Sequence, residues 1–170
     1  MIYAVAIITV VLGVAMDQFT KYLAITYIKD NPITILEGVF QLRYLENHGA
    51  AFGMLQNQQW FFLIITVVTL GIVTFIYLRL PKEKHFIPLR ICLVILVAGA
   101  IGNMIDRIRF QYVVDIFYFE LIDFPIFNVA DIFATVSTLV LILLFLFYYS
   151  EEDFDLIFQI FKSKRKENQG

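Results

Sequence analysis

The chain has 170 residues, of which 60% are hydrophobic and only 16% charged, and its net charge is −2. Soluble domains carry about 25% charged residues, so this composition excludes an ordinary soluble protein and indicates an integral membrane protein. The charge balance gives no support for nucleic-acid binding, and the length predicts one folding unit.

Four apolar segments are long enough, or nearly so, to cross a bilayer as helices, which takes about 20 residues. They are residues 2–16 (helical character should continue to residue 25), 60–78, 91–105 and 132–149. The third is short, but Arg90 can extend to the membrane surface and the helix can continue through Asp106. A cleavable signal peptide is an alternative for the first segment, although no Lys or Arg precedes it.

Two segments between these spans have the composition of strands. Residues 39–45 and 112–119 are rich in β-branched and aromatic side chains. The predicted fold class is therefore an all-α membrane protein, with four transmembrane helices and a small extracytoplasmic β module. Residues 1–150 would form this domain, and residues 151–170 a cytoplasmic tail.

Basic residues predict the orientation of the chain in the membrane. Four lie in the connection after the second span and four in the tail, which makes eight of the thirteen Lys and Arg residues. By the positive-inside rule, both termini face the cytoplasm, and residues 26–59 and 107–130 face outward.

In the tail, Phe154, Ile157, Phe158 and Phe161 recur at helical spacing before a basic cluster. This pattern suits a helix lying on the inner leaflet, and a frayed polar tail is the alternative.

Polar residues collect near the predicted outer ends of the spans. Each has a structural interpretation: Asp17 and Lys21 as an i,i+4 ion pair, Asp106 beside Arg107 as a salt bridge, and Asn128 as a helix N-cap. Considered together, five acidic or amide groups fall in one outward-facing layer. They are Asn103, Asp106, Asp115, Asn128 and Asp131.

The residue types present exclude serine, cysteine and zinc catalysis and leave a pair of carboxylates as the catalytic groups. Ser137 lies roughly 9 Å deeper along its helix than Asp131, with no Lys in the spans to activate it. Cys92 is the only cysteine, it has no basic partner, and the two histidines give no zinc-ligand spacing. Two neighbouring carboxylates that share a proton can hydrolyse an amide with water alone, so neither a metal nor another cofactor is expected.

Five motifs in order resemble the bacterial lipoprotein signal peptidase (type II signal peptidase) over residues 1–150. They are Asp17-Gln18-Phe19-Thr20-Lys21, Asn47-His48-Gly49-Ala50-Ala51-Phe52, Gly102-Asn103-Met104-Ile105-Asp106-Arg107, Val113-Val114-Asp115 and Phe127-Asn128-Val129-Ala130-Asp131. One departure is Ile132, where the family usually has a small polar residue, and the tail lies outside the resemblance.

The resemblance implies an aspartic endopeptidase of the bacterial cytoplasmic membrane. Its substrate would be a prolipoprotein that carries a diacylglyceryl group on the lipobox cysteine, cleaved just before that cysteine. By motif, Asp115 and Asp131 match the catalytic pair. Residues matched to substrate binding are Asn47, Gly49, Asn103, Arg107 and Asn128; those matched to structural support are Asp17, Lys21 and Asp106. We expect a monomer in contact with membrane lipid.

Two other classes of protein remain as alternatives. A small transporter or channel could bind cations with outward carboxylates, but the span interiors offer no charged path across the bilayer. A non-catalytic scaffold would have no need for the polar layer. Within the enzyme interpretation, Asp106 competes with Asp115, and we favour Asp115 because Arg107 offers Asp106 a structural partner.

Overall fold

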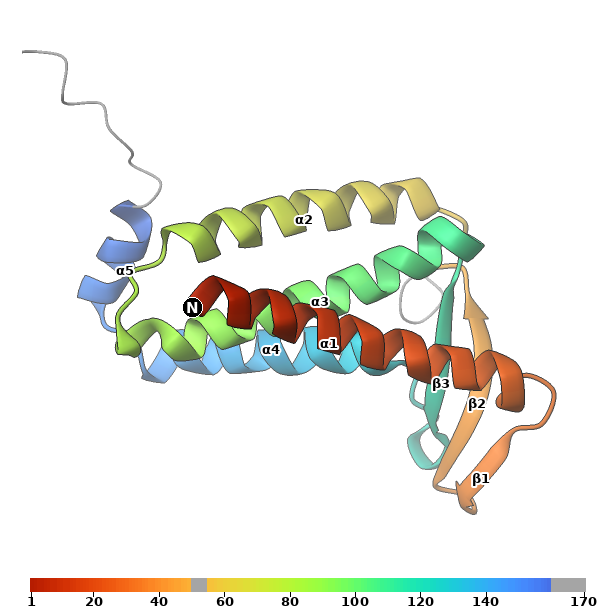
Figure 1. The fold of residues 1–170 in the computed structure, drawn as a ribbon. Coiled ribbons are helices and arrows are strands. Elements are labelled where there is room, and N and C mark those ends of the chain that lie inside the picture. The colour runs from red at the N-terminus through yellow and green to blue at the C-terminus, as the bar shows by residue number, and fades with distance from the viewer. Residues whose placement is uncertain (50–54, 160–170) are drawn as a thin grey trace, which may run out of the picture.

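The computed structural model describes residues 1–49 and 55–159 and contains the four predicted long helices. They are α1 (Ile2–Leu23), α2 (Gln59–Arg79), α3 (Ile87–Phe110) and α4 (Val129–Phe147), and each is long and apolar enough to cross a membrane. Figure 1 shows their axes roughly aligned, with successive helices running in opposite directions, a small sheet at one end and the N-terminus at the other. The predicted fold class is confirmed.

Helix α3 lies at the centre of the bundle and packs against α1, α2 and α4. Small residues make this close packing possible. A Cβ atom at Gly99 would lie 2.5 Å from the backbone oxygen of Ala130 in α4. A Cβ atom at Gly102 would lie 2.5 Å from Asp17 Oδ2 in α1. This close approach brings polar side chains from three helices together.

Helix α3 begins earlier than predicted, at Ile87 instead of Ile91. Arg90 therefore lies inside the helix and is only 3% exposed. Its guanidinium donates to the carbonyl oxygens of Tyr77 and Leu80 at the end of α2, at 3.1 and 2.7 Å. Carbonyls at a helix C-terminus lack partners within the helix, so this cation is accommodated by capping α2 rather than by reaching water.

The sheet has three antiparallel strands in the order β1-β2-β3. Strands β2 (Phe40–Asn47) and β3 (Val113–Phe119) correspond to the two predicted strands, with β2 extending two residues further, to Asn47. Strand β1 (Ile33–Leu36) was not predicted. A π-helical turn, Ala24–Ile28, continues α1 and packs its buried residues against Val114 and Ile116 of β3. This apolar contact fixes the sheet on the end of the bundle.

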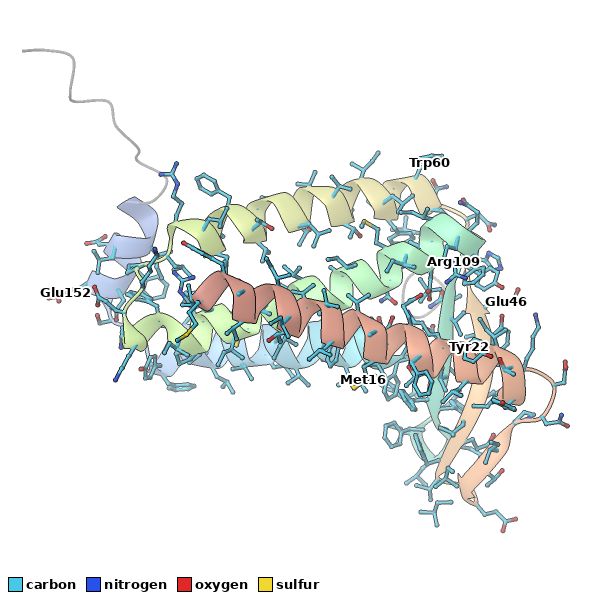
Figure 2. All side chains as sticks on the ribbon, viewed as in Figure 1. Met16, Tyr22, Glu46, Trp60, Arg109 and Glu152 are labelled. Atoms are coloured by element: carbon cyan, nitrogen blue, oxygen red, sulfur yellow. The ribbon has the colours of Figure 1, made fainter. Side chains whose placement is uncertain are left out.

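The opposite end of the bundle carries a fifth helix, α5 (Glu151–Gln159). Residues Glu151–Gln159 are thus helical, which is one of the two alternatives for the tail, and Phe161 and the basic cluster lie outside the described residues. The position of this helix on the inner leaflet stays a prediction. Phe154 and Ile157 pack onto the apolar cluster around Phe86 and Tyr149, so α5 is attached to the bundle itself. Figure 2 shows Glu152 at this end and Glu46 and Arg109 at the sheet end.

Candidate active site

A cavity of about 360 Å³ lies where α3 and α4 meet the sheet. Six of the residues singled out from the sequence line it: Asn47, Gly49, Asn103, Arg107, Asp115 and Asp131. They come from β2 and the residues after it, from α3, from β3 and from α4. The fold therefore brings together the polar groups that the sequence places far apart.

Asp115 lies on β3 and is only 1% exposed. Its Oδ2 accepts a hydrogen bond from Asn47 Nδ2 at 2.8 Å, and its Oδ1 accepts one from Asn128 Nδ2 at 2.7 Å. Strand pairing explains the first bond, because Asn47 is opposite Val113 and Asp115 is the next residue on the same face of β3. Burial, together with the charge of Asp131, raises the pKa of Asp115 to about 7.

Asp131 lies in the first turn of α4 and takes part in a capping box. Its Oδ2 accepts from the backbone N–H of Asn128 at 3.2 Å, while Asn128 Oδ1 accepts from the backbone N–H of Asp131 at 3.0 Å. The two bonds satisfy backbone donors that a helix start leaves free. Asp131 Oδ1 accepts from Asn103 Nδ2 at 2.8 Å. One oxygen of this carboxylate thus takes part in the cap of α4, and the other accepts a hydrogen bond from Asn103 of α3.

Asn128 contacts both carboxylates, which the sequence did not reveal. It caps α4 as predicted, and its Nδ2 also donates to Asp115. The residue before it is bound to β3, because Phe127 and Phe117 exchange backbone hydrogen bonds of 2.8 and 3.1 Å. Asn128 is fully buried and does not line the cavity. Its role in binding substrate stays a prediction, and its contacts in the structure are those of a bridge between the two aspartates.

Asp17, Lys21 and Asp106 form a second buried polar group next to the cavity. Lys21 Nζ lies 2.9 Å from both Asp17 Oδ2 and Asp106 Oδ2. Asp106 also accepts from Val114 N at 3.1 Å and from Gln18 Nε2 at 2.9 Å, so both of its oxygens are occupied. It does not line the cavity. The partner expected for Asp106 was Arg107, and the structure instead pairs it with Lys21.

Arg107 lies four residues after Asn103 on the same face of α3, and both side chains line the cavity. Its guanidinium lies over the ring of Phe62 in α2, 4.7 Å from the ring centre, in a cation–π contact. The ion pairs found within residues 1–49 and 55–159 do not include Arg107. This cation thus faces the cavity and the two carboxylates without being neutralised by a direct ion pair.

Part of the cavity wall was missed by the sequence reasoning. Residues 124–127 line it, and so do Ala134 and Thr135, about one helical turn after Asp131 in α4. Thr135 is four residues after Asp131, so helical spacing could have identified it. Residues 124–127 carry no comparable signal, because their position depends on the pairing of Phe127 with β3. In the described part of the chain, no three His, Cys, Asp or Glu side chains are placed to hold a metal ion.

Comparison with known proteins identifies the family. The family model described as signal peptidase (SPase) II matches residues 9–147. The chain belongs to the signal peptidase II family. The lipoprotein signal peptidase of Streptococcus pyogenes serotype M1 is 39% identical over 150 residues, which are 87% of this chain and 95% of that protein. The corresponding protein of serotype M5 (strain Manfredo) is 37% identical over the same shares.

Solved structures agree with this membership. A bacterial membrane enzyme solved by the in meso method at 2.3 Å resolution superposes with a TM-score of 0.77 at 28% identity, over 98% of this chain and 95% of that one. A second, at 1.9 Å resolution, gives a TM-score of 0.75 at 30% identity, over 86% and 95%. The chain is thus a multi-pass bacterial membrane protein and a protease of the signal peptidase II family.

Proposed function

We propose that this signal peptidase II family member removes signal peptides from diacylglyceryl-modified prolipoproteins by cutting just before the lipidated cysteine. Asp115 and Asp131 act as the catalytic pair with a water molecule. The observation that carries the proposal is that both carboxylates line one cavity and that amide groups, instead of cations, bind all four of their oxygens. This arrangement orients the pair and leaves its charge available for chemistry.

The position of the cavity suits a lipidated substrate. It lies where apolar helices of membrane-spanning length end and the sheet begins. The acyl chains of a lipidated cysteine can remain among the helices, because burying each CH₂ group in an apolar medium is favourable by about 0.8 kcal/mol. The scissile peptide bond, a few atoms away from the lipid, then reaches the carboxylates at the boundary.

The two aspartates have different environments, and this difference assigns their roles. The pKa of Asp115 is raised to about 7, so this carboxyl group holds a proton over much of the range below neutral pH. Asp131 lies in the first turn of α4, where its carboxylate accepts hydrogen bonds from Asn103 Nδ2 and from the backbone N–H of Asn128. We therefore assign Asp115 as the acid and Asp131 as the base.

The reaction follows from these protonation states. Asp131 takes a proton from water while the water oxygen attacks the scissile carbonyl carbon, and Asp115 gives its proton to the carbonyl oxygen. The product is a neutral tetrahedral diol, with the dyad proton now on Asp131. Asp131 then protonates the leaving nitrogen as the carbon–nitrogen bond breaks, and Asp115 recovers a proton from a diol hydroxyl. The dyad ends with one proton, as it began.

Five neighbouring residues complete the proposed site. Arg107 faces the cavity and binds a carbonyl oxygen of the peptide or of a glyceryl ester, since a guanidinium is a strong donor. Asn47 and Asn103 orient the two aspartates, and Asn128 bridges them. Gly49 donates its backbone N–H to Asn47 Oδ1 at 3.0 Å, which fixes the Asn47 amide and leaves room for substrate. Lys21 with Asp17 and Asp106 supports this layer.

The enzyme acts as a monomer in the cytoplasmic membrane, with both termini in the cytoplasm and the catalytic pair on the outer side. The distribution of basic residues supports this orientation. Arg79, Lys82 and Lys84 lie at the end of the bundle opposite the sheet, where the chain passes from α2 to α3 (Figure 1).

Purified protein in detergent, mixed with a diacylglyceryl-modified prolipoprotein, tests the proposal. We expect cleavage just before the modified cysteine and slow or no cleavage of the unmodified form. Asp115→Asn and Asp131→Asn should each lower the rate by about a thousandfold, because general acid–base groups contribute about 10²–10⁴-fold. The matched control is Asp30→Asn, which changes an exposed aspartate and should leave the rate unchanged.

Two results would contradict the proposal. One is full cleavage by folded Asp115→Asn or Asp131→Asn protein. The other is loss of activity on adding a chelator, which would indicate metal-dependent hydrolysis. An ion-dependent flux in reconstituted vesicles, without any cleavage, would favour the transporter alternative. Globomycin, to which the family resemblance predicts sensitivity, should inhibit the wild-type reaction.

A further inference from the structure

Lys21 has an unusual set of partners for a buried lysine. It is only 2% exposed, and its ammonium group has three oxygen partners, each at 2.9 Å. Two are the carboxylates Asp17 Oδ2 and Asp106 Oδ2. The third is the side-chain oxygen of Asn103, which lines the cavity. An ion pair alone explains the first two contacts and leaves the third to be explained.

The third contact determines which way the Asn103 amide faces. An ammonium group has three donors and no acceptor, so the amide atom beside it must be the oxygen. The NH₂ group of Asn103 is then directed to Asp131 Oδ1, 2.8 Å away, and must donate to it. If the amide turned over, an NH₂ group would face the ammonium and an oxygen would face the carboxylate. Both contacts would be repulsive.

The same orientation extends to Asp115. The oxygen of Asn103 also accepts from Asn128 Nδ2 at 3.2 Å. This contact holds the NH₂ group of Asn128 on the side where it donates to Asp115 Oδ1, and it leaves Asn128 Oδ1 to accept the backbone N–H of Asp131. A continuous set of hydrogen bonds, all of fixed direction, thus runs from Lys21 through two amides to both carboxylates.

We propose that Lys21 is a positioning residue of the catalytic pair: it fixes the orientation of the Asn103 amide, and through it that of Asn128, so that both aspartates are bound by donors. The inference rests on the proposed function, since it assumes that Asp115 and Asp131 carry out the reaction. It adds a defined task to an ion pair that would otherwise serve only to hold α1 against α3.

Lys21 also supplies the positive charge nearest to this hydrogen-bond network. The charged groups around the network are Asp17 from α1, Asp106 and Arg107 from α3, Asp115 from β3 and Asp131 from α4. With Lys21 removed, Arg107 is the only cation left in that set. The ionised form of the dyad is then less favoured, so the pH at which activity falls on the acid side should move upward.

A double-mutant cycle separates positioning from simple structural support. Lys21→Met removes the ammonium and keeps the length of the side chain, and Asn103→Ala removes the amide. We expect Lys21→Met alone to lower kcat by about tenfold or more with little change in KM, because coupled neighbours in one network interact by about this amount. In the Asn103→Ala background the same change should lower kcat by less than about twofold, because the amide that it orients is gone.

Three further measurements complete the experiment. Lys29→Met, which removes an exposed lysine paired with Glu46, is the matched control and should leave kcat and its pH profile unchanged. If Lys21→Met does not fold, the cycle is run in the Asp106→Asn background, where one buried negative charge is already removed. The acid limb of the pH profile should shift upward with Lys21→Met and not with Lys29→Met.

The outcomes distinguish this inference from the proposed function. Equal losses of kcat from Lys21→Met with and without Asn103, or an unshifted acid limb, would overturn the positioning role while the dyad assignment stands. Full cleavage by Asp115→Asn or Asp131→Asn protein would instead overturn the proposed function and, with it, the basis of the inference. A coupled loss together with the shifted acid limb supports it.

Discussion

Two pairs of aspartates lie near each other at the sheet end of this bundle, and different groups of the protein bind their carboxylates. Asp17 and Asp106 share the ammonium of Lys21 at 2.9 Å each and are fully buried. Asp115 and Asp131 face a cavity, and their oxygens are bound by three amide side chains and one backbone N–H. No ion pair involves either of them in residues 1–49 and 55–159.

The difference separates structural carboxylates from reactive ones. A buried ion pair holds both partners in their charged forms, because losing either charge leaves the other uncompensated. Neutral donors bind a carboxylate firmly without neutralising it, so desolvation and mutual repulsion can still raise its affinity for a proton. In this protein the first arrangement joins helices, and the second leaves a pair that can exchange a proton with a substrate.

We expect the largest difference between the two aspartate pairs in how much a substitution lowers the free energy of unfolding. Lys21→Met leaves two buried carboxylates without their cation, and breaking such a pair costs about 3–5 kcal/mol. Asp115→Asn removes a charge that already lacks an ion-pair partner, so its effect should be smaller. Thermal unfolding of both variants in one detergent at pH 8 measures this comparison. An equal fall in melting temperature would show that the two pairs do not differ in this way.

A second prediction concerns the close approach of α1 and α3. Gly102→Ala places a methyl group within 2.5 Å of Asp17 Oδ2, so the ion-paired group must shift. Overpacking of this kind costs about 1–3 kcal/mol. Gly71→Ala in α2 is the matched control, because in the described part of the chain no atom outside its own stretch of helix lies within 4 Å of the added methyl group. Thermal unfolding should show a loss for the first variant and no loss for the second.

A third prediction uses the pH dependence of the cavity pair. The pKa of Asp115 is raised, so its proton is retained up to about pH 7 and lost above that value. If Asp115 is the acid, kcat/KM should fall by about tenfold per pH unit well above pH 7, since the free enzyme must hold that proton. Rates on lipidated prolipoprotein from pH 5 to 9 test this, and a flat profile up to pH 9 would exclude Asp115 as the acid.

The smallest effect is expected for the exposed ion pair of the sheet. Lys29 and Glu46 lie 3.1 Å apart, with side chains that are 47% and 34% exposed. Water and salt screen such a pair, so Glu46→Gln should leave both the melting temperature and the cleavage rate unchanged. A marked change in either quantity would mean that the sheet surface takes part in the site.

The helices could be predicted from the sequence because their signal is local. Hydropathy located all four, and Asn128, as a favoured N-cap residue, indicated the start of α4. The predicted start of α3, Ile91, lies after the observed one, Ile87, because the charge of Arg90 was taken to mark the membrane surface. Arg90 is accommodated by carbonyl groups of α2, and hydropathy contains no information about such a contact.

The site could be predicted only as a set of residues, without its contacts. The motif resemblance singled out five of the six polar side chains that line the cavity, all except that of Thr135, and also Gly49. The bonds that give them their roles join Asn47 to Asp115, 68 residues away, and Lys21 to Asn103, 82 residues away. These contacts depend on the register of β2 with β3 and on the packing of α1 against α3, which a single sequence does not specify. Strand β1 was missed because it is four residues long and exposed.

The most direct test of the account is the cleavage rate of four variants that each replace one aspartate by asparagine. Rates on lipidated prolipoprotein are divided by the amount of folded protein for Asp17→Asn, Asp106→Asn, Asp115→Asn and Asp131→Asn. We predict that the last two lose about a thousandfold or more, while the first two stay within about tenfold of wild type and lose stability instead. An inactive but folded Asp106→Asn protein, beside an active Asp115→Asn protein, would contradict the account.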